Sequence, residues 1–354
     1  MIKPIEHAKG RGAGYNPDNP HLKQMYVVSE PTAVDEIPSG ERKTVFRFEH
    51  PKTVVNKAPL DDVGLNYSMN PYQGCEHGCV YCYARPTHQY WGLSAGLDFE
   101  QVVIVKENAP RLLAKFINKG NWTGEPIALS GNTDCYQPAE KEFKITRKCL
   151  EVFLAYNHPV TIITKNHLIL RDLDLLKELA RKNLVRVTIS LTTLNESLRR
   201  NLEPRTSTGL KRLETIAKLK EAGIPVSVNI APIIPGLNHI EIPVLLKEAA
   251  NAGAYSATMI MVRLNGPLGD LFTDWLKTFY PDRMERVLNL IKSCHGGKLS
   301  DSRPGIRMRG EGNVAESITK LFQLYKKKYF TQTTPPELTS GKFISINGRQ
   351  MEIF

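Results

Sequence analysis

The sequence predicts an α/β fold: a partial, TIM-like (β/α)6 barrel with an N-terminal arm and a C-terminal helical extension. The first observation is a regular alternation of short β-branched runs and helical patterns across residues 65–265, which is typical of βαβ units and a parallel sheet. The second is the number of units, because six are too few for a closed eight-fold barrel and suit an open three-quarter barrel. The third is a globular composition, with 41% hydrophobic and 23% charged residues.

Residues 1–64 form the predicted arm or cap. They are rich in Pro, Asn, Asp and Gly, and they carry one predicted short strand at residues 44–48. Lys9 and Arg11, with the intervening and following glycines, make a basic tip that we interpret as a mobile terminus.

Residues 65–265 form the predicted barrel. Its six strands are predicted at residues 65–69, 127–130, 160–164, 184–191, 226–231 and 256–264. Apolar residues at helical spacing predict helices near residues 145–156, 173–180, 210–217 and 239–253. Gly223, with Pro225 just beyond it, ends the third of these helices. In barrels of this kind the chemistry takes place at the carboxyl ends of the strands.

Residues 266–354 form the predicted C-terminal extension. Pro281 suits the first position of one helix. A second helix carries an apolar stripe from Val314 to Tyr325 and ends in three lysines. Asn347-Gly348, between alternating apolar residues, predicts a terminal hairpin.

The chain is basic, with 47 Lys and Arg against 36 Asp and Glu, a formal charge of +11. This charge fits either a merely soluble basic protein or one with a polyanionic partner such as nucleic acid. No apolar run approaches the roughly 20 residues of a membrane helix, so no membrane partner is expected. The first residues lack the apolar core of a secretory signal, and the cysteines are not spaced in pairs. Together these features predict a cytoplasmic location.

A cysteine loop at residues 70–83 holds three of the six cysteines, Cys75, Cys79 and Cys82, in a C-x3-C-x2-C pattern. Thiolates favour iron–sulfur clusters and zinc. A structural zinc normally takes four protein ligands, and a [4Fe–4S] cube has four irons to hold. Three thiolates leave one iron of a cube free to bind a non-protein group. The alternative is a zinc site completed by His77 or His88.

The stretch from Asn70 to Arg85, Asn-Pro-Tyr-Gln-Gly-Cys-Glu-His-Gly-Cys-Val-Tyr-Cys-Tyr-Ala-Arg, resembles the radical S-adenosylmethionine (radical SAM) superfamily, and within it the group related to spore photoproduct lyase. The resemblance runs from about residue 65 to residue 295. It implies a [4Fe–4S] cluster on the three cysteines and S-adenosylmethionine (SAM) at the open iron. Reductive cleavage of SAM would then yield a 5′-deoxyadenosyl radical. It also implies an electron donor such as flavodoxin or ferredoxin.

Polar residues at the strand ends are the candidate SAM ligands. Lys165 closes an otherwise apolar strand and must reach solvent or an anion, and the Ser190 hydroxyl can bond a ribose or carboxylate. Asn229 is expected to end the fifth strand. By resemblance, the methionine ammonium binds after the second strand, where this chain has Asn132, Thr133 and Asp134.

Two further residues receive cofactor roles from the resemblance. Arg205 would pair with the SAM carboxylate, a bidentate match that lysine cannot reproduce; the alternative is a surface salt bridge to Glu203. Tyr81 would lie near adenine, mainly through its backbone.

The candidate catalytic residues are Tyr83 and Cys135. Tyr83 flanks the last loop cysteine, a position implicated in hydrogen-atom transfer in spore photoproduct lyase, although packing around the cluster is the alternative. That enzyme also uses a cysteine hydrogen donor at the end of the second strand. Here Asn132 matches the donor position and Cys135 lies three residues later, so photoproduct lyase activity itself stays open.

The predicted function is radical SAM chemistry on a nucleic acid, DNA rather than RNA, as lyase-like repair or base modification. The alternatives are radical modification of a protein or small molecule, and a non-catalytic protein that binds a metal or nucleic acid. Three basic groups would supply a phosphate footprint, with an ordinary solvated surface as the alternative. They are Lys141, Lys144, Arg147 and Lys148; Arg199, Arg200, Lys211 and Arg212; and Arg303, Arg307 and Arg309.

Overall fold

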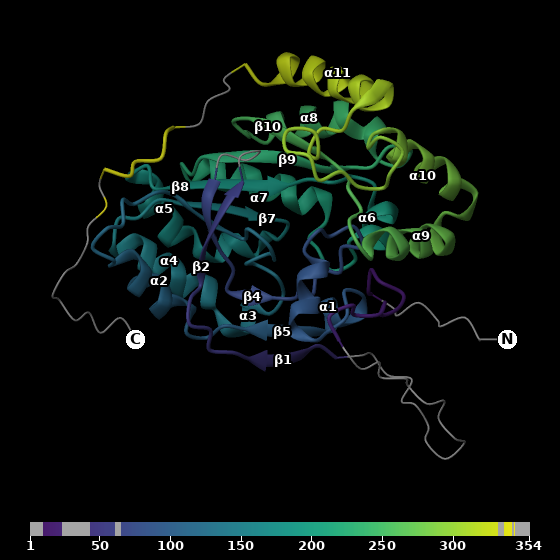
Figure 1. Ribbon diagram of the computed structural model, residues 1–354. Helices are drawn as coiled ribbons and strands as arrows, with labels where there is room; N and C mark the ends of the chain where they lie inside the picture. The colour runs from purple at the N-terminus through teal and green to yellow at the C-terminus, as the bar shows by residue number, and fades with distance from the viewer. Residues whose placement is uncertain (1–9, 23–42, 61–64, 332–335, 342, 344–354) are drawn as a thin grey trace.

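A seven-stranded sheet, in the order β10-β9-β8-β7-β6-β3-β2, forms the centre of the computed structural model (Figure 1). The structure describes residues 10–22, 43–60, 65–331, 336–341 and 343. Six of the strands are parallel to one another. They are β3 (Leu65–Met69), β6 (Ile127–Leu129), β7 (Val160–Thr164), β8 (Val185–Ser190), β9 (Val226–Ile233) and β10 (Ala257–Met261).

This sheet confirms the predicted α/β class and all six barrel strands. Strand order follows chain order from β3 to β10, as successive right-handed βαβ units require. Among the described residues β10 and β2 are the outer strands, so the sheet is open. The edge strand β2 (Val55–Leu60) pairs antiparallel with β3 and was not predicted, because the arm shows weak periodicity.

A smaller sheet joins the arm to the cysteine loop. Its order is β1 (Val45–Phe48), β5 (Val102–Val105) and β4 (Tyr72–Gln73), with β1 parallel and β4 antiparallel to β5. It lies along the lower side of the molecule in Figure 1. The predicted strand at residues 44–48 is therefore confirmed as β1. Strand β5 was missed because its four apolar residues follow α1 without a turn signal.

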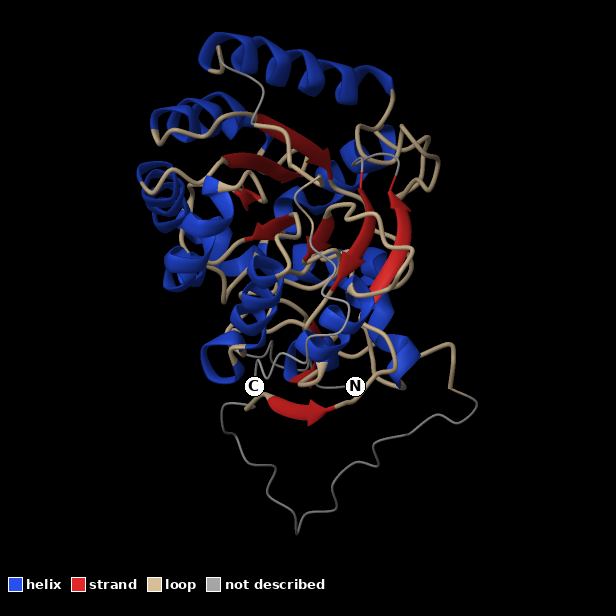
Figure 2. Cartoon of the chain, turned by 90° about the vertical axis from the view of Figure 1, so that its left-hand side faces the viewer, coloured by secondary structure: helices blue, strands red, loops and turns tan. Residues whose placement is uncertain are grey.

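Helices fill the connections between the parallel strands and pack against one another in succession: α2 on α4, α4 on α5, and α7 on α8. Figure 2 shows the helices beside the strands, with α11 across one end. The bounds are α1 (Leu97–Gln101), α2 (Ala109–Ile117), α3 (Glu140–Phe143), α4 (Ile145–Ala155), α5 (Leu173–Arg181), α6 (Glu196–Leu202), α7 (Gly209–Glu221), α8 (Ile242–Asn251), α9 (Leu268–Phe279), α10 (Met284–Ser293) and α11 (Gly312–Tyr329). Four short 3₁₀ segments accompany them: η1 (Arg85–Trp91), η2 (His167–Asp172), η3 (His239–Glu241) and η4 (Pro281–Arg283).

Local sequence signals set several helix ends. The Thr208 side chain accepts a hydrogen bond from the Lys211 N–H and so caps α7. Gly223 ends that helix at a φ of 76°, as predicted. The helix predicted from residue 239 is divided into η3 and α8, and Pro281 begins η4 rather than α10. The predicted hairpin at Asn347-Gly348 lies outside the described residues.

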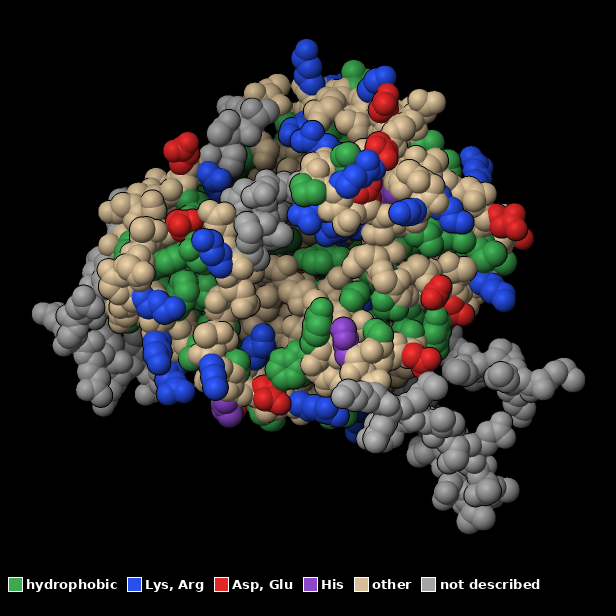
Figure 3. All heavy atoms as spheres, viewed as in Figure 1, with side chains coloured by type: hydrophobic (Ala, Val, Ile, Leu, Met, Phe, Trp, Pro, Cys, Tyr) green, Lys and Arg blue, Asp and Glu red, His purple; other side chains and the backbone are tan. Residues whose placement is uncertain are grey.

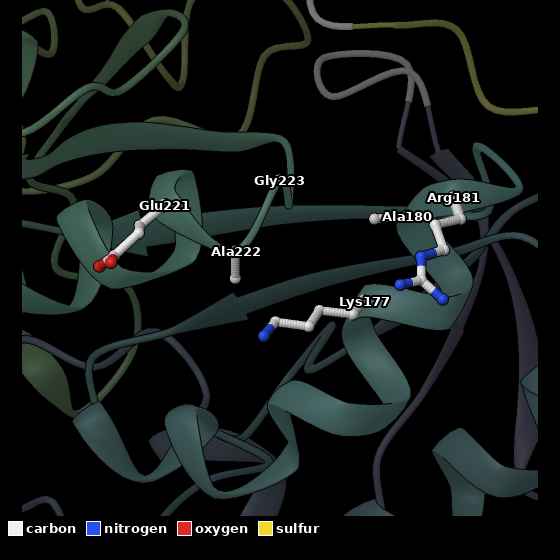
Figure 4. Close-up of a pocket in the computed structure, with 6 residues that line it drawn as sticks. All are labelled: Lys177, Ala180, Arg181, Glu221, Ala222 and Gly223. Carbon is white, nitrogen blue, oxygen red and sulfur yellow. The ribbon is translucent and has the colours of Figure 1, made fainter.

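An open pocket of about 410 Å³ lies between the C-terminal ends of α5 and α7 (Figure 4). Lys177, Arg181, Glu221 and Gly223 are among its lining residues. Because these helices lead into the amino ends of β8 and β9, the pocket is at the edge of the sheet opposite the strand carboxyl ends. A second open pocket is lined by Lys144, Arg147, Arg171 and Asp174, without any of the loop cysteines. In the part of the chain that is described, no helix is both long and apolar enough to cross a membrane.

Candidate active site

The cysteine loop, residues 70–83, leaves the carboxyl end of β3 and leads into η1. Cys75 and Cys79 are buried in two separate apolar clusters. Cys82 is partly buried and packs against both clusters. Gly74 and Gly78 have φ values of 79° and 69°, which glycine adopts without the cost that a Cβ imposes. The loop therefore turns sharply on either side of Cys75 at the mouth of the sheet.

Hydrogen bonds to other segments fix the main chain of this loop. The Cys75 N–H donates to the Phe99 carbonyl at 2.8 Å, and the Val80 N–H donates to the Leu202 carbonyl at 3.1 Å. The amide side chain of Gln137 accepts from one loop N–H and donates to one loop carbonyl, both at 3.0 Å. The loop is held from three directions.

The three thiols fit a [4Fe–4S] cluster. Burial raises the pKa of Cys75, Cys79 and Cys82, so stable thiolates require a cationic partner such as iron. Among the described residues no three His, Cys, Asp or Glu side chains converge on the point that a single metal ion would occupy. A cube binds each thiolate through a different iron, so its cysteines need not converge in that way. The three cysteine thiols on this loop therefore suit a cube.

His77 in the loop is buried, and each of its ring nitrogens lies near another side chain. Its Nδ1 lies 3.5 Å from Oδ2 of Asp134, and its Nε2 lies 3.1 Å from the Asn166 amide nitrogen. Burial lowers the pKa of His77 to about 4, so the ring is neutral. Both ring nitrogens of His77 therefore face other side chains of the protein.

Asp134, after β6, accepts hydrogen bonds from the protein at both carboxylate oxygens. Oδ1 accepts from the Thr164 hydroxyl at 2.8 Å and the Tyr136 N–H at 2.9 Å. Oδ2 accepts from the Lys165 N–H at 2.8 Å and lies 3.5 Å from Nδ1 of His77. The carboxylate therefore joins the ends of β6 and β7 and contacts the cysteine loop.

The two residues before Asp134 contact the start of the cysteine loop. The Asn132 amide donates to Gln73 at 3.2 Å and to Thr87 at 3.1 Å. The Thr133 hydroxyl donates to the Tyr72 carbonyl at 2.6 Å and is buried. Of the two side chains, only that of Asn132 is partly exposed at the mouth.

Tyr81 joins the loop to a buried ion pair. Its hydroxyl donates to Glu203, which is also bonded by the Arg212 guanidinium; both charged groups are almost fully buried. Burial alone would raise the pKa of Glu203, but Arg212 and Lys165 bring it below its ordinary value. The Lys165 ammonium lies 5.8 Å from the centre of the Tyr81 ring. The Tyr81 side chain is therefore fixed.

Arg205 pairs with Glu76 of the cysteine loop at 3.3 Å. The alternative of a surface salt bridge to Glu203 is wrong, because Glu203 is buried with Arg212. The Arg205 side chain remains 39% exposed, so part of its guanidinium faces solvent beside the loop. Its N–H also donates to the His77 carbonyl at 3.2 Å.

Ser190, at the end of β8, and Asn229, within β9, lie side by side because they are partners in the parallel register. Asn229 does not end its strand as predicted, since β9 continues to Ile233. Its side-chain oxygen accepts from the Thr258 hydroxyl of β10 at 3.1 Å. The sequence underestimated β9 because Pro232 suggested a break.

Tyr83 and Cys135 differ in exposure. Tyr83 is 47% exposed, its hydroxyl donates to the Gly131 carbonyl at 2.8 Å, and the Arg263 guanidinium lies 5.9 Å from its ring centre. Cys135 is fully buried in the main core, and burial raises the pKa of its thiol. Its backbone N–H donates to the Ser130 hydroxyl at 2.7 Å.

Several arginines of the three predicted basic groups form ion pairs within the protein. Arg199 and Arg212 are buried, so they cannot form a surface phosphate site. Arg147 pairs with Asp172 and Asp174, and Arg303 pairs with Asp301 and Glu311. Figure 3 shows Lys and Arg side chains spread over the visible face rather than gathered in one block.

A sequence profile of the Radical SAM superfamily matches residues 69–249, half of the chain. The chain belongs to the radical SAM superfamily. Its cofactors are a [4Fe–4S] cluster and SAM, which members of this superfamily use. Membership of this superfamily supports the prediction that the protein is an enzyme. The matched region begins just before the cysteine loop and ends in α8.

Proteins of several other organisms are similar in sequence to this chain. An uncharacterized protein of Mycobacterium tuberculosis is 35% identical over 246 residues, which cover 68% of this chain and 72% of the relative. An uncharacterized protein of Methanocaldococcus jannaschii is 30% identical over 231 residues, covering 65% and 83%. The radical SAM Nα-GlyT isomerase of Pseudomonas phage M6 is 23% identical over 284 residues, covering 79% and 57%.

Solved structures of spore photoproduct lyase share the fold. The complex of that enzyme with dinucleoside spore photoproduct superposes with a TM-score of 0.61 at 18% identity, covering 81% of this chain and 80% of the other. A double mutant of the same enzyme with bound SAM and dinucleoside spore photoproduct gives a TM-score of 0.60 with the same coverage. The profile match confirms the expected superfamily, and these structures confirm the expected fold.

Proposed function

We propose that this radical SAM enzyme cleaves SAM reductively and uses the resulting 5′-deoxyadenosyl radical on a nucleic acid. The observation that carries the proposal is the set of three thiols on one rigid loop at the carboxyl ends of the parallel strands. Cys75, Cys79 and Cys82 would hold the cluster. When bound, the cluster supplies an electron to the sulfonium of SAM and a free iron to hold the methionine moiety.

Residues around the loop would bind and orient SAM. Arg205 would donate to its carboxylate, because its partly exposed guanidinium lies beside the loop. Lys165, Ser190 and Asn229 would face it from the neighbouring strands β7, β8 and β9. Asn132 would reach it through its partly exposed amide.

Three other predicted ligands would act by positioning. Asp134 and Thr133 bond to the protein rather than to solvent. Tyr81 is fixed through Glu203, so its side chain would hold the loop and only its backbone would approach adenine. These assignments follow from how each polar atom is already satisfied.

Tyr83 would carry the hydrogen atom between the radical and the substrate. Its exposure at the mouth and the bond that fixes its hydroxyl support this role. Cys135 is the second candidate, and its burial means that a donor role would require the core to open.

Three observations support a nucleic-acid substrate, with DNA ahead of RNA. The chain carries a formal charge of +11, which favours a polyanion, and Arg263 lies beside the exposed Tyr83. Spore photoproduct lyase, which shares the fold, binds a dinucleoside photoproduct. A repair lyase reaction or a base modification would both use this site, and a protein or small-molecule substrate is the competing outcome.

Anaerobic turnover tests the radical chemistry. Protein reconstituted with iron and sulfide, and given dithionite and SAM, should release 5′-deoxyadenosine. Cys79→Ala should abolish both the cluster absorbance and the product, whereas Cys294→Ala, at a buried cysteine outside the loop, should retain both. A wild-type protein that binds zinc tightly and forms no cluster would overturn the proposal.

Filter binding across a salt series tests the substrate class. For duplex DNA, single-stranded DNA and RNA, the logarithm of the binding constant should fall linearly with the logarithm of the salt concentration. Arg263→Gln should weaken it, and Arg181→Gln, an exposed arginine at the opposite edge of the sheet, should not. Absent or salt-independent binding would remove the nucleic-acid proposal and leave the radical chemistry intact.

A further inference from the structure

Residues 10–19, which we name the cover segment, pack against the cysteine loop and the elements that follow it. Arg11, Gly12 and Ala13 are buried. The interpretation of this stretch as a mobile basic tip is therefore wrong for the described residues, and Lys9 lies outside them. The segment also lies outside the region that matches the superfamily profile.

The first connection runs through Glu100 of α1, whose carboxylate is fully buried. It accepts from the Gly12 N–H at 2.9 Å and from the Ala13 N–H at 2.8 Å. The same carboxylate pairs with the Arg85 guanidinium at 2.5 Å. Arg85 in turn donates from Nε to the Cys79 carbonyl at 2.9 Å. Two residues, Glu100 and Arg85, thus connect the cover segment to the backbone of Cys79.

The second connection reaches the loop at Glu76. Arg11 donates to the Glu100 carbonyl at 2.6 Å and to the Thr44 hydroxyl at 3.3 Å. The Thr44 hydroxyl donates to the Glu76 carboxylate at 2.8 Å. The arm therefore contacts the loop on both sides of His77.

Direct packing closes the space between these connections. A Cβ on Gly12 would lie 1.7 Å from the Gly78 carbonyl oxygen, so the two backbones touch there. The φ of Gly12 is not in the left-handed region, so contact rather than conformation requires glycine. A Cβ on Gly78 would itself lie 2.9 Å from the Glu100 carboxylate. No water fits between backbones at this separation.

We propose that the cover segment is a fixed part of the cluster site, which holds the Gly78–Cys79 backbone in place and excludes water and dioxygen from that side of the cluster. The inference rests on ligation of the cluster by Cys75, Cys79 and Cys82. Gly12 is the residue on which the close contact depends, and Glu100 is the acceptor that joins the segment to Arg85. Both are positioning residues.

Gly12→Ala tests the cover segment, with Gly120→Ala as the matched control. Gly120 is exposed, has nothing within 4 Å of its Cβ position and is not in the left-handed region. The added methyl at residue 12 must displace the segment from Gly78. We expect the reconstituted Gly12→Ala protein to lose its visible cluster absorbance several-fold faster in air than wild type. Hydrogen–deuterium exchange should rise in peptides covering the cysteine loop, while Gly120→Ala matches wild type in both measurements.

The outcomes separate this inference from the cluster assignment. A wild-type protein that takes up no cluster would overturn the assignment itself. Wild type and Gly12→Ala that bleach and exchange at the same rate would overturn the cover segment alone. If Gly12→Ala does not fold, as judged by thermal unfolding, Asn16→Ala decides, because Asn16 is exposed and only fastens the segment to Asp98. Unchanged bleaching in Asn16→Ala would then contradict the proposal.

Discussion

The Nδ1 atom of His77 lies 3.5 Å from Oδ2 of Asp134, so a ring from the cysteine loop contacts the carboxylate that follows β6. The same carboxylate binds the Thr164 hydroxyl and the Lys165 N–H at the end of β7. This one carboxylate, 11% exposed, thus aligns the loop with two strand ends. Such fully satisfied networks are costly to disturb, because each donor that loses its acceptor remains desolvated.

Asp134→Asn should destabilise the protein by about 2 kcal/mol, because an amide offers one acceptor oxygen where two were used. The free energy of unfolding in urea measures this loss, and iron content after reconstitution should fall with it. If Asp134 instead bound the SAM ammonium directly, stability and iron content would stay at wild-type values while SAM binding weakened.

Arg205→Lys should raise the Kd for SAM roughly tenfold, because lysine lacks the planar fork that matches a carboxylate. Equilibrium dialysis with the reconstituted protein measures the Kd. Cluster content should not change. Arg200→Lys is the matched control, because Arg200 is 69% exposed and only approaches Glu196. Equal affinity in the two variants would remove Arg205 from the SAM site.

Tyr83→Phe should lower the deuterium content of the 5′-deoxyadenosine that forms during turnover in D₂O. A phenolic hydrogen exchanges with solvent, so transfer from the Tyr83 oxygen to the 5′ carbon carries deuterium into the product. Mass spectrometry of the product measures it. Cys135→Ala should leave the deuterium content unchanged, since its thiol is buried in the core; the reverse pattern would identify Cys135 as the donor.

Glu203→Gln should cost about 3–5 kcal/mol of stability, because it leaves the Arg212 guanidinium buried without a counter-charge. Urea unfolding measures the loss. Glu196→Gln, at a carboxylate that is 43% exposed beside the buried Arg199, should cost no more than about 1 kcal/mol, because solvent screens the exposed partner. Equal losses of stability in the two variants would show that the Arg212–Glu203 pair stabilises the protein no more than the Arg199–Glu196 pair.

Because of His158, the free energy of unfolding should fall as the pH is lowered from neutral into mild acid. Burial lowers its pKa from 6.5 to about 4, and its ring bonds to Trp122 at 2.9 Å. The unfolded chain therefore binds the proton first, so stability is complete above about pH 6.5 and is lost as the pH falls toward 4. His158→Gln should flatten part of this profile, worth up to about 3 kcal/mol. An unchanged slope between wild type and variant would contradict the assignment.

How far prediction from the sequence succeeded depended on whether the signal was local. The periodicity of β7, which matched residue for residue, and the cysteine spacing are local patterns. Strand β2 was missed because the arm shows weak periodicity. Strand β5 was missed because it follows α1 without a turn signal and its partner β1 lies in the distant arm. The alternative salt bridge of Arg205 to Glu203 was wrong for a similar reason: Glu203 is near Arg205 in sequence but pairs with Arg212 in the fold.

The sequence by itself determined the parallel α/β architecture and the three-thiol loop after the first barrel strand. Both follow from side-chain periodicity and ligand chemistry, which depend only on nearby residues. Only the tertiary structure decided which polar groups remain available. It placed Asp134 and Glu203 inside closed hydrogen-bond networks, and it brought Gly12 against Gly78 across the intervening chain. Such contacts depend on how separate elements pack, and close packing admits only residues that fit.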